Sequence, residues 1–131
     1  MPALSLYAEN AVVNALLRNT PITWPTSWYL ALYTTNPTYL DTGTEISFSG
    51  GTNYARQPIL FGAPTAGAVS NTTDLTFPLA GITWGNITYA AVRDAPTGGH
   101  LLFYGSMVTP RYISSGDVLK FLTGNVVCTV S

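Results

Sequence analysis

Few side chains in this sequence could act as a nucleophile or as a general base. His100 is the only histidine and Cys128 is the only cysteine. Nucleophilic catalysis needs a serine or cysteine beside such a base, together with an orienting carboxylate. His100 follows two glycines and is expected in an exposed turn, whereas Cys128 lies in the apolar run VVCTV at 126–130 and is expected to be buried. We therefore expect no catalytic residues.

The acidic residues leave two other kinds of site open. Glycoside hydrolysis needs two carboxylates that face each other across a sugar, and six acids allow many such pairs. Asp94 and Asp117, however, stand in turn sequences where aspartate usually bonds to nearby backbone. Asp41 and Glu45, with neighbouring threonine hydroxyls, form a weak calcium pattern that lacks EF-hand spacing. We expect no metal and no other cofactor.

The composition excludes several classes of protein. Only 8% of the residues are charged, 47% are hydrophobic, and the formal net charge is −1. Five dispersed Lys and Arg residues form no basic surface for nucleic acid, and no apolar run is long enough to cross a membrane. A single cysteine excludes a disulfide framework, and one cysteine with one histidine excludes a Cys/His zinc site. A surface this poor in charge favours a protein that packs against copies of itself or against neighbours.

One helix is expected at the start of the chain, over residues 4–18. Ser5 is a suitable N-cap, and Glu9 lies near the positive end of the helix dipole. Apolar residues recur with a period close to 3.6, which leaves Ser5, Glu9, Asn14 and Arg18 on a polar side. The sequence before Pro21 ends the helix. The opening residues show no signal peptide, so we expect synthesis in a cytoplasm.

After Pro25 the chain consists of short strand patterns separated by Gly, Pro and Asn. Residues 28–34 suit a strand buried between layers, and Pro58 places the strand at 57–61 either on an edge or at a bulge. Two hairpins are expected, 87–92 with 101–104 and 118–122 with 126–130. The long excursion at 38–53 reads as loop. We predict a mainly β fold, an antiparallel β-sandwich or jelly roll with one N-terminal α-helix, in a single domain over 1–131 whose helical arm covers about 4–18.

The sequence resembles a family of small tailed-bacteriophage virion proteins that are labelled as tail fibre proteins. The pieces that carry the resemblance occur in order from about residue 5 to the end, and are mostly turn and core signatures. They are LYAEN at 6–10 with ALL at 15–17, LALYT at 30–34 with Pro37, GTEI at 43–46, Gly50-Gly51, YARQ at 54–57, Phe77-Pro78, Trp84-Gly85, DAPTGG at 94–99, LFYG at 102–105 and Gly116-Asp117. Residues 47–49 stand as an insertion relative to the pattern.

The resemblance implies a non-enzymatic virion structural protein with a compact β-fold and no catalytic residues. A compact domain without shaft or repeats favours a capsid decoration or cement protein, which stabilises the head by multicopy surface binding. The alternative is a tail fibre or tail-tip component, including a receptor- or carbohydrate-binding module. The expected partners are a second or third copy of the chain and other virion proteins, such as the major capsid protein or tail proteins, with neither nucleic acid nor membrane.

Interface residues are predicted from apolar and aromatic side chains in the arm, in the excursion and in an expected loop. Alternatively, these side chains cover the protein's own core. The candidates are Leu4, Leu6, Tyr7, Tyr39, Leu40, Phe48, Tyr112 and Ile113.

Overall fold

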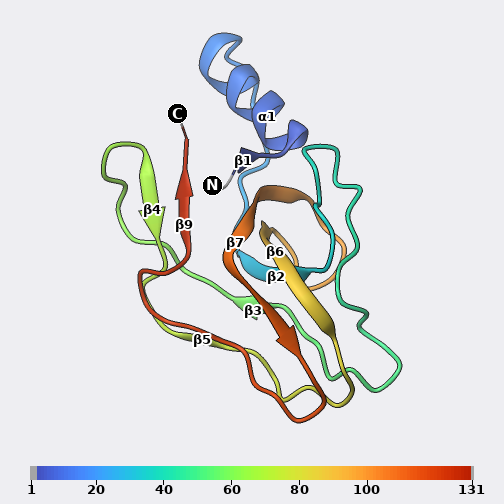
Figure 1. The fold of residues 1–131 in the computed structure, drawn as a ribbon. Coiled ribbons are helices and arrows are strands. Elements are labelled where there is room, and N and C mark those ends of the chain that lie inside the picture. Colours follow the sequence, from blue (N-terminus) through green and yellow to red (C-terminus); the bar gives the residue numbers. More distant parts are fainter. Residues whose placement is uncertain (1–2, 131) are drawn as a thin grey trace.

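The computed structural model describes residues 3–130 and is mainly β, with one helix that projects from one end of a sheet (Figure 1). Five antiparallel strands form this sheet in the order β1-β7-β6-β2-β3, and two two-stranded ladders, β4-β9 and β5-β8, complete the fold. The predicted class, mainly β and antiparallel with an N-terminal helix, is confirmed. The strands are β1 (Ala3–Leu4), β2 (Tyr29–Tyr33), β3 (Gln57–Pro58), β4 (Ala68–Ser70), β5 (Leu75–Thr76), β6 (Gly85–Arg93), β7 (Leu101–Ile113), β8 (Lys120–Phe121) and β9 (Val127–Thr129).

The helix α1 (Leu6–Leu17) has the N-cap that its sequence predicts and ends before Pro21, as expected. The side chain of Ser5 accepts a hydrogen bond of 3.1 Å from the backbone N–H of Ala8, which makes Ser5 the N-cap. Arg18 closes the helix, and its backbone N–H donates to the Asn14 carbonyl. Leu4 was expected in the helix but lies in β1, where it pairs with Phe103. No helix within residues 3–130 is long and apolar enough to cross a membrane.

The strand β2 lies inside the sheet, between β6 and the edge strand β3, and is buried on both faces, as predicted. Leu30 and Leu32 point into the main core, while Ala31 and Tyr33 belong to a second cluster on the opposite face. At the sheet's edge, β3 contains Pro58, which has no N–H to donate to a further strand. The predicted edge position of this strand is therefore confirmed.

The predicted hairpin of residues 87–104 is present as β6 and β7, but β7 is much longer than expected. It continues to Ile113, so the loop expected at Tyr112 and Ile113 is wrong. The ladder holds a large bulge, because Tyr89 pairs with Ser106 and Ile87 with Arg111, which leaves residues 107–110 of β7 opposite Thr88 alone. On its other edge, β7 is paired at residues 103–104 with β1; within the described chain, no other strand pairs along that edge.

The hairpin predicted at 118–130 is wrong. The strand β8 pairs with β5, and β9 pairs with β4. The intervening turn docks on a distant segment instead: the Asn71 side chain accepts a 2.9 Å hydrogen bond from the Val126 N–H, and Asp74 accepts one of 2.8 Å from the Thr123 N–H. These contacts hold the two strands apart, each against its own partner.

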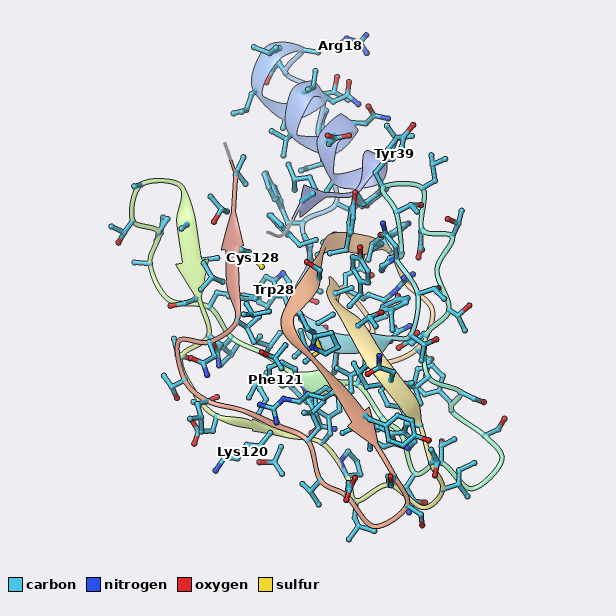
Figure 2. The ribbon with its side chains drawn as sticks, viewed as in Figure 1. Arg18, Trp28, Tyr39, Lys120, Phe121 and Cys128 are labelled. Carbon is cyan, nitrogen blue, oxygen red and sulfur yellow. The ribbon has the colours of Figure 1, made fainter. Side chains whose placement is uncertain are left out.

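The main core lies between the large sheet and the two ladders, as in a β-sandwich. The sheet contributes side chains such as Leu32 and Ile87, and the ladders contribute Leu75 and Cys128. Trp84 is buried there, and its indole N–H donates to the Thr52 carbonyl at 2.8 Å. In Figure 2, Cys128 lies between β9 and β7. This core fixes the framework from which the arm and the excursion extend.

Candidate interaction surface

Four of the predicted interface residues lie together where the N-terminal end of α1 contacts the excursion at 38–53. The backbone N–H of Leu6 donates to the Tyr39 carbonyl at 2.8 Å. Leu6, Tyr7, Tyr39 and Leu40 together line a hollow of about 220 Å³, and each is at least one third exposed. Figure 2 places Tyr39 beside the start of the helix. We call these four residues the arm–loop surface.

His100 anchors the root of the arm to the turn that joins β6 and β7. Its ring is stacked on Tyr7, with 3.9 Å between ring centroids and 2° between planes. Its backbone N–H donates to Asp94 at 2.7 Å, and its Nδ1 lies 3.1 Å from the other carboxylate oxygen. Partial burial acts to raise the pKa of Asp94, but these hydrogen bonds outweigh it and lower that pKa. His100 thus occupies the exposed turn that its sequence predicts.

Arg93 ties the tip of the excursion to the sheet. Its guanidinium donates to both carboxylate oxygens of Asp41, at 2.7 and 2.8 Å, and to the Tyr33 hydroxyl at 2.8 Å. It also donates to the carbonyls of Gly98 and Gly99. Burial is the main reason why the pKa of Tyr33 is raised. The bidentate geometry fixes both the position and the orientation of the Asp41 segment.

Arg56 makes a second, more deeply buried clamp on the same loop. Two of its nitrogens donate to Glu45 at 2.7 Å, and a third donates to the carbonyls of Ala95 and Gly98 at 2.8 and 2.9 Å. The Tyr54 hydroxyl also donates to Glu45 at 2.7 Å, and burial together with this carboxylate raises the pKa of Tyr54. Both arginines therefore bind the Gly98 carbonyl and lock the excursion and the turn together.

Asp41 and Glu45, the pair considered for calcium, are both engaged by guanidinium groups. Among residues 3–130, no group of three or more His, Cys, Asp or Glu side chains is placed to hold a metal ion. Asp117 accepts a hydrogen bond from the Ser114 N–H, the local backbone bond that its turn sequence predicts. The acidic side chains of these loops therefore stabilise the loop conformations, through arginine pairs or through a backbone hydrogen bond.

The other four predicted residues lie elsewhere. Leu4 is half-buried in β1, and Tyr112 is exposed near the end of β7. The ring of Phe48 packs against Tyr54 with centroids 5.1 Å apart, and the Arg56 guanidinium lies 5.3 Å from it. Ile113 is 5% exposed and belongs to the main core, so it does not reach the surface of this chain.

The most exposed apolar residues of the arm were not predicted as interface residues. Val13, Leu16 and Leu17 point away from the sheet, with Leu16 77% and Leu17 79% exposed, and Trp24 in the following segment is 70% exposed. Ala8 is the buried residue of the helix, and Ala11 and Ala15 are half-buried. The expected apolar side therefore meets the body through alanines. A count of large apolar residues at i, i+3 and i+4 would have found the outward face.

A groove of about 550 Å³ runs between β7 and the C-terminal segment. Its lining includes Phe103, Met107, Phe121 and Cys128, with Arg111 and Lys120 as its charged members. Burial raises the pKa of the Cys128 thiol to about 12, so this sulfur is a neutral core group at physiological pH. The predicted burial of Cys128 is confirmed.

A comparison with known protein families gave a match that covers nearly the whole chain. The family described as podophage GP4 fiber I protein gp80 matches residues 3–129. The chain belongs to this family. A comparison with curated proteins gave no match. The family supports a virion structural protein, and it favours the tail fibre alternative over the capsid decoration interpretation.

Proposed function

We propose that this protein is a non-enzymatic component of a bacteriophage tail fibre and that it works by binding other virion proteins. The single observation that carries the proposal is the family match, which spans residues 3–129 and names a podophage fibre protein. The described chemistry agrees with a binding role, since the buried thiol is neutral and the loop acids are paired or hydrogen-bonded. The expected localisation is the virion.

The arm–loop surface is the proposed attachment site. Arg93 and Arg56 hold the excursion in one conformation, so Tyr39 and Leu40 are presented on a preorganised loop. A preorganised surface loses little conformational entropy when it binds, which leaves more of the interaction energy for affinity. Partly exposed tyrosines supply large contact areas of the kind that dominate protein interfaces. A protein partner fits this surface better than nucleic acid, because three of the five cations already pair with carboxylates among residues 3–130.

The test is incorporation of a Tyr39→Ser/Leu40→Ser variant into phage particles. We expect the variant to be lost from purified particles, because two exposed apolar anchors are removed, while its thermal unfolding stays unchanged. Leu60→Ser/Leu79→Ser is the matched control, since both leucines are more than half exposed and lie outside the arm–loop surface.

Fractionation of the particles decides between the two virion sites. Recovery of the protein with detached tails supports the fibre assignment. Recovery with isolated heads would support capsid decoration instead and would overturn the proposal. Full retention of the Tyr39→Ser/Leu40→Ser variant would exclude the arm–loop surface as the attachment site.

A receptor-binding role for carbohydrate is the second candidate. The hollow beside Tyr7 and Tyr39 favours it, because aromatic faces next to polar groups are suited to a sugar ring. Micromolar binding of the purified protein on a glycan array, lost in Tyr39→Ser, would support this role. Absence of binding across the array counts against it.

A further inference from the structure

The groove between β7 and the C-terminal segment at 119–128 is an opening in the main core. Its lining includes Ala90 of β6 and Gly105 of β7, which stand directly opposite each other in the ladder. Ala90 packs against the main core, and residues that are paired in this way share one face of the sheet. Two of the smallest residues therefore lie where a β-sandwich normally fills the space between its layers with larger side chains. The groove of about 550 Å³ lies above them.

The walls of the groove are apolar. Phe103 and Met107 line it from β7, and Phe121 and Val126 line it from the C-terminal segment. All four are partly buried side chains that pack against the main core, so each keeps some surface open to the groove. Apolar hollows of about 300–1,000 Å³ are typical sites for small molecules, which they hold by burying an apolar body and orienting it with a few polar groups.

Arg111 supplies a positive charge on the core-facing side of the sheet. It stands opposite Ile87, whose side chain is fully buried in the main core. Ile113, two residues further along β7, also belongs to the main core, and alternate residues of a strand share a face. Arg111 therefore lies on the face that meets the ladders, and it lines the groove. Within residues 3–130 its guanidinium makes no hydrogen bond or ion pair, in contrast to the guanidinium groups of Arg56 and Arg93.

Lys120 is the second cation of the groove, and no aspartate or glutamate lines it. The Lys120 ammonium lies 3.5 Å from Asp74, and both side chains are about half exposed, so this ion pair is weak. Asp74 also accepts hydrogen bonds from the backbone and the hydroxyl of Thr123. In Figure 2, Phe121 lies between Cys128 and Lys120, so the apolar wall continues to the lysine. A hollow lined by charge of one sign attracts a ligand of the opposite sign.

We propose that the groove binds a small amphipathic anion, with its apolar chain between β7 and the C-terminal segment and its negative head group on Arg111. Charge complementarity selects the anion, and the apolar walls and the volume select a small apolar body. A free guanidinium binds a carboxylate through two parallel N–H···O hydrogen bonds. The groove shares no lining residue with the arm–loop surface, so the inference goes beyond the proposed function and does not depend on it.

The first test compares two probes of equal chain length and opposite charge, decanoate and decyltrimethylammonium. Isothermal titration calorimetry on the purified full-length protein, below the micelle concentration of each probe, measures both affinities. We expect one decanoate site, with a dissociation constant at least about tenfold lower than that of the cation, because only the anion pairs with Arg111. Absence of decanoate binding, or equal affinity for both probes, overturns the proposal.

The second test removes the charge. Arg111→Leu should weaken decanoate binding at least about tenfold, because hydrogen bonds to a charged partner are lost. Arg18→Leu is the matched control, since it removes the same charge from an exposed cation at the C-cap of α1, outside the groove. It should leave the affinity unchanged. Equal weakening in both variants would show general attraction by net charge and would overturn the proposal.

The third test fills the groove. Ala90→Leu places a larger side chain in the hollow and should abolish decanoate binding, and thermal unfolding checks that the variant is folded. Affinity equal to that of the wild type in folded Ala90→Leu overturns the proposal. If that variant does not fold, Met107→Lys replaces it: this change puts a charge into the apolar wall, and unchanged decanoate affinity would be equally decisive against the groove.

Amide chemical shifts locate the site in the wild-type protein. Decanoate should shift the resonances of residues 103–107 and 119–128, whereas changes confined to the arm–loop surface overturn the proposal. The comparison probe is an acetylated tetrapeptide of leucine, phenylalanine, valine and aspartate. If this peptide binds in the groove more tightly than decanoate, the site belongs to a polypeptide partner and the proposal of a small ligand is wrong.

Discussion

Arg56 and Arg93 hold the excursion against the turn that follows β6. Each guanidinium binds one carboxylate in a bidentate manner and also binds carbonyls of the turn that follows β6. Their donors are therefore used inside the chain and are unavailable to an anionic ligand. Loop positions 41 and 45 are thereby fixed relative to the turn, and with them the direction in which Tyr39 and Leu40 project.

We predict that Arg56→Leu lowers the free energy of unfolding by about 3–5 kcal/mol, because Glu45 is left buried without its cation. The two side chains are only 3% and 15% exposed, so solvent cannot replace the lost partner. Urea unfolding at pH 7 measures the change. In a double-mutant cycle, Glu45→Gln added to Arg56→Leu should cost much less than the sum of the two single changes.

Arg111→Leu is the matched control for that measurement. Arg111 is exposed and lies on the bulged part of the sheet, so its replacement should change stability by no more than about 0.5 kcal/mol. If Arg56→Leu and Arg111→Leu lowered the free energy of unfolding by the same amount, the buried Arg56–Glu45 pair would contribute nothing to stability.

At the scale of elements, local sequence predicts the helix with its Ser5 cap, the buried strand β2 and the hairpin of β6 with the start of β7. Each of these has its signal within a few neighbouring residues. The pairing of β8 and β9 has no such signal, since Asn71 and Asp74 take the turn's backbone groups from about 50 residues away. Long-range side-chain contacts of this kind override the hairpin preference of TGN at 123–125.

The candidate surface was predictable in part for the same reason. Tyr39 and Leu40 stand out as apolar residues in a polar excursion, and Leu6 and Tyr7 in a helical arm. Their meeting depends on the Arg93–Asp41 pair, whose members are 52 residues apart. The outward face of α1 was not predicted, because apolar residues occur on several sides of this helix. Only the packing of α1 against β7 determines which of them face the body.

The turn before β7 contains two glycines, Gly98 and Gly99, whose surroundings differ. We predict that Gly99→Ala is more destabilising than Gly98→Ala. Both glycines have positive φ, at +71° and +61°, a strain of about 1–3 kcal/mol for alanine. At Gly99 a Cβ would also collide with the Asp94 carboxylate and lie 2.7 Å from the Ala95 Cβ, whereas at Gly98 it meets nothing within 4 Å.

Thermal unfolding of both variants gives the comparison. The shared strain cancels between them, so the difference reports the collision alone. Equal melting temperatures would show that the turn relaxes around the added methyl group.

The whole molecule is expected to lose stability in alkali. The pKa of Cys128 is raised to about 12 by burial, and those of Tyr54 and Tyr33 are raised as well. A group whose folded pKa exceeds its unfolded value binds a proton more tightly in the folded state, so its contribution is complete at neutral pH and is lost as pH rises. Between pH 9 and 10 the loss caused by the thiol steepens toward a limit of about 1.4 kcal/mol per pH unit, and the two tyrosines add to the loss as the pH approaches 10.

Urea unfolding at pH 8, 9 and 10 measures this slope in the wild type and in Cys128→Ala. The variant should be less stable at pH 8, because a buried side chain is shortened, but its stability should fall less steeply above pH 9. A slope equal to that of the wild type would show that the thiol is not the titrating group.

The bulge at residues 107–110 has a consequence for contacts between strand edges of different chains. An open strand edge invites pairing with another chain, and crowded edges can join into ribbons. Here the free side of β7 is bent out of line where four residues face one, and Pro110 withholds an N–H. This stretch of β7 is therefore poorly suited to pair with a strand edge of another chain.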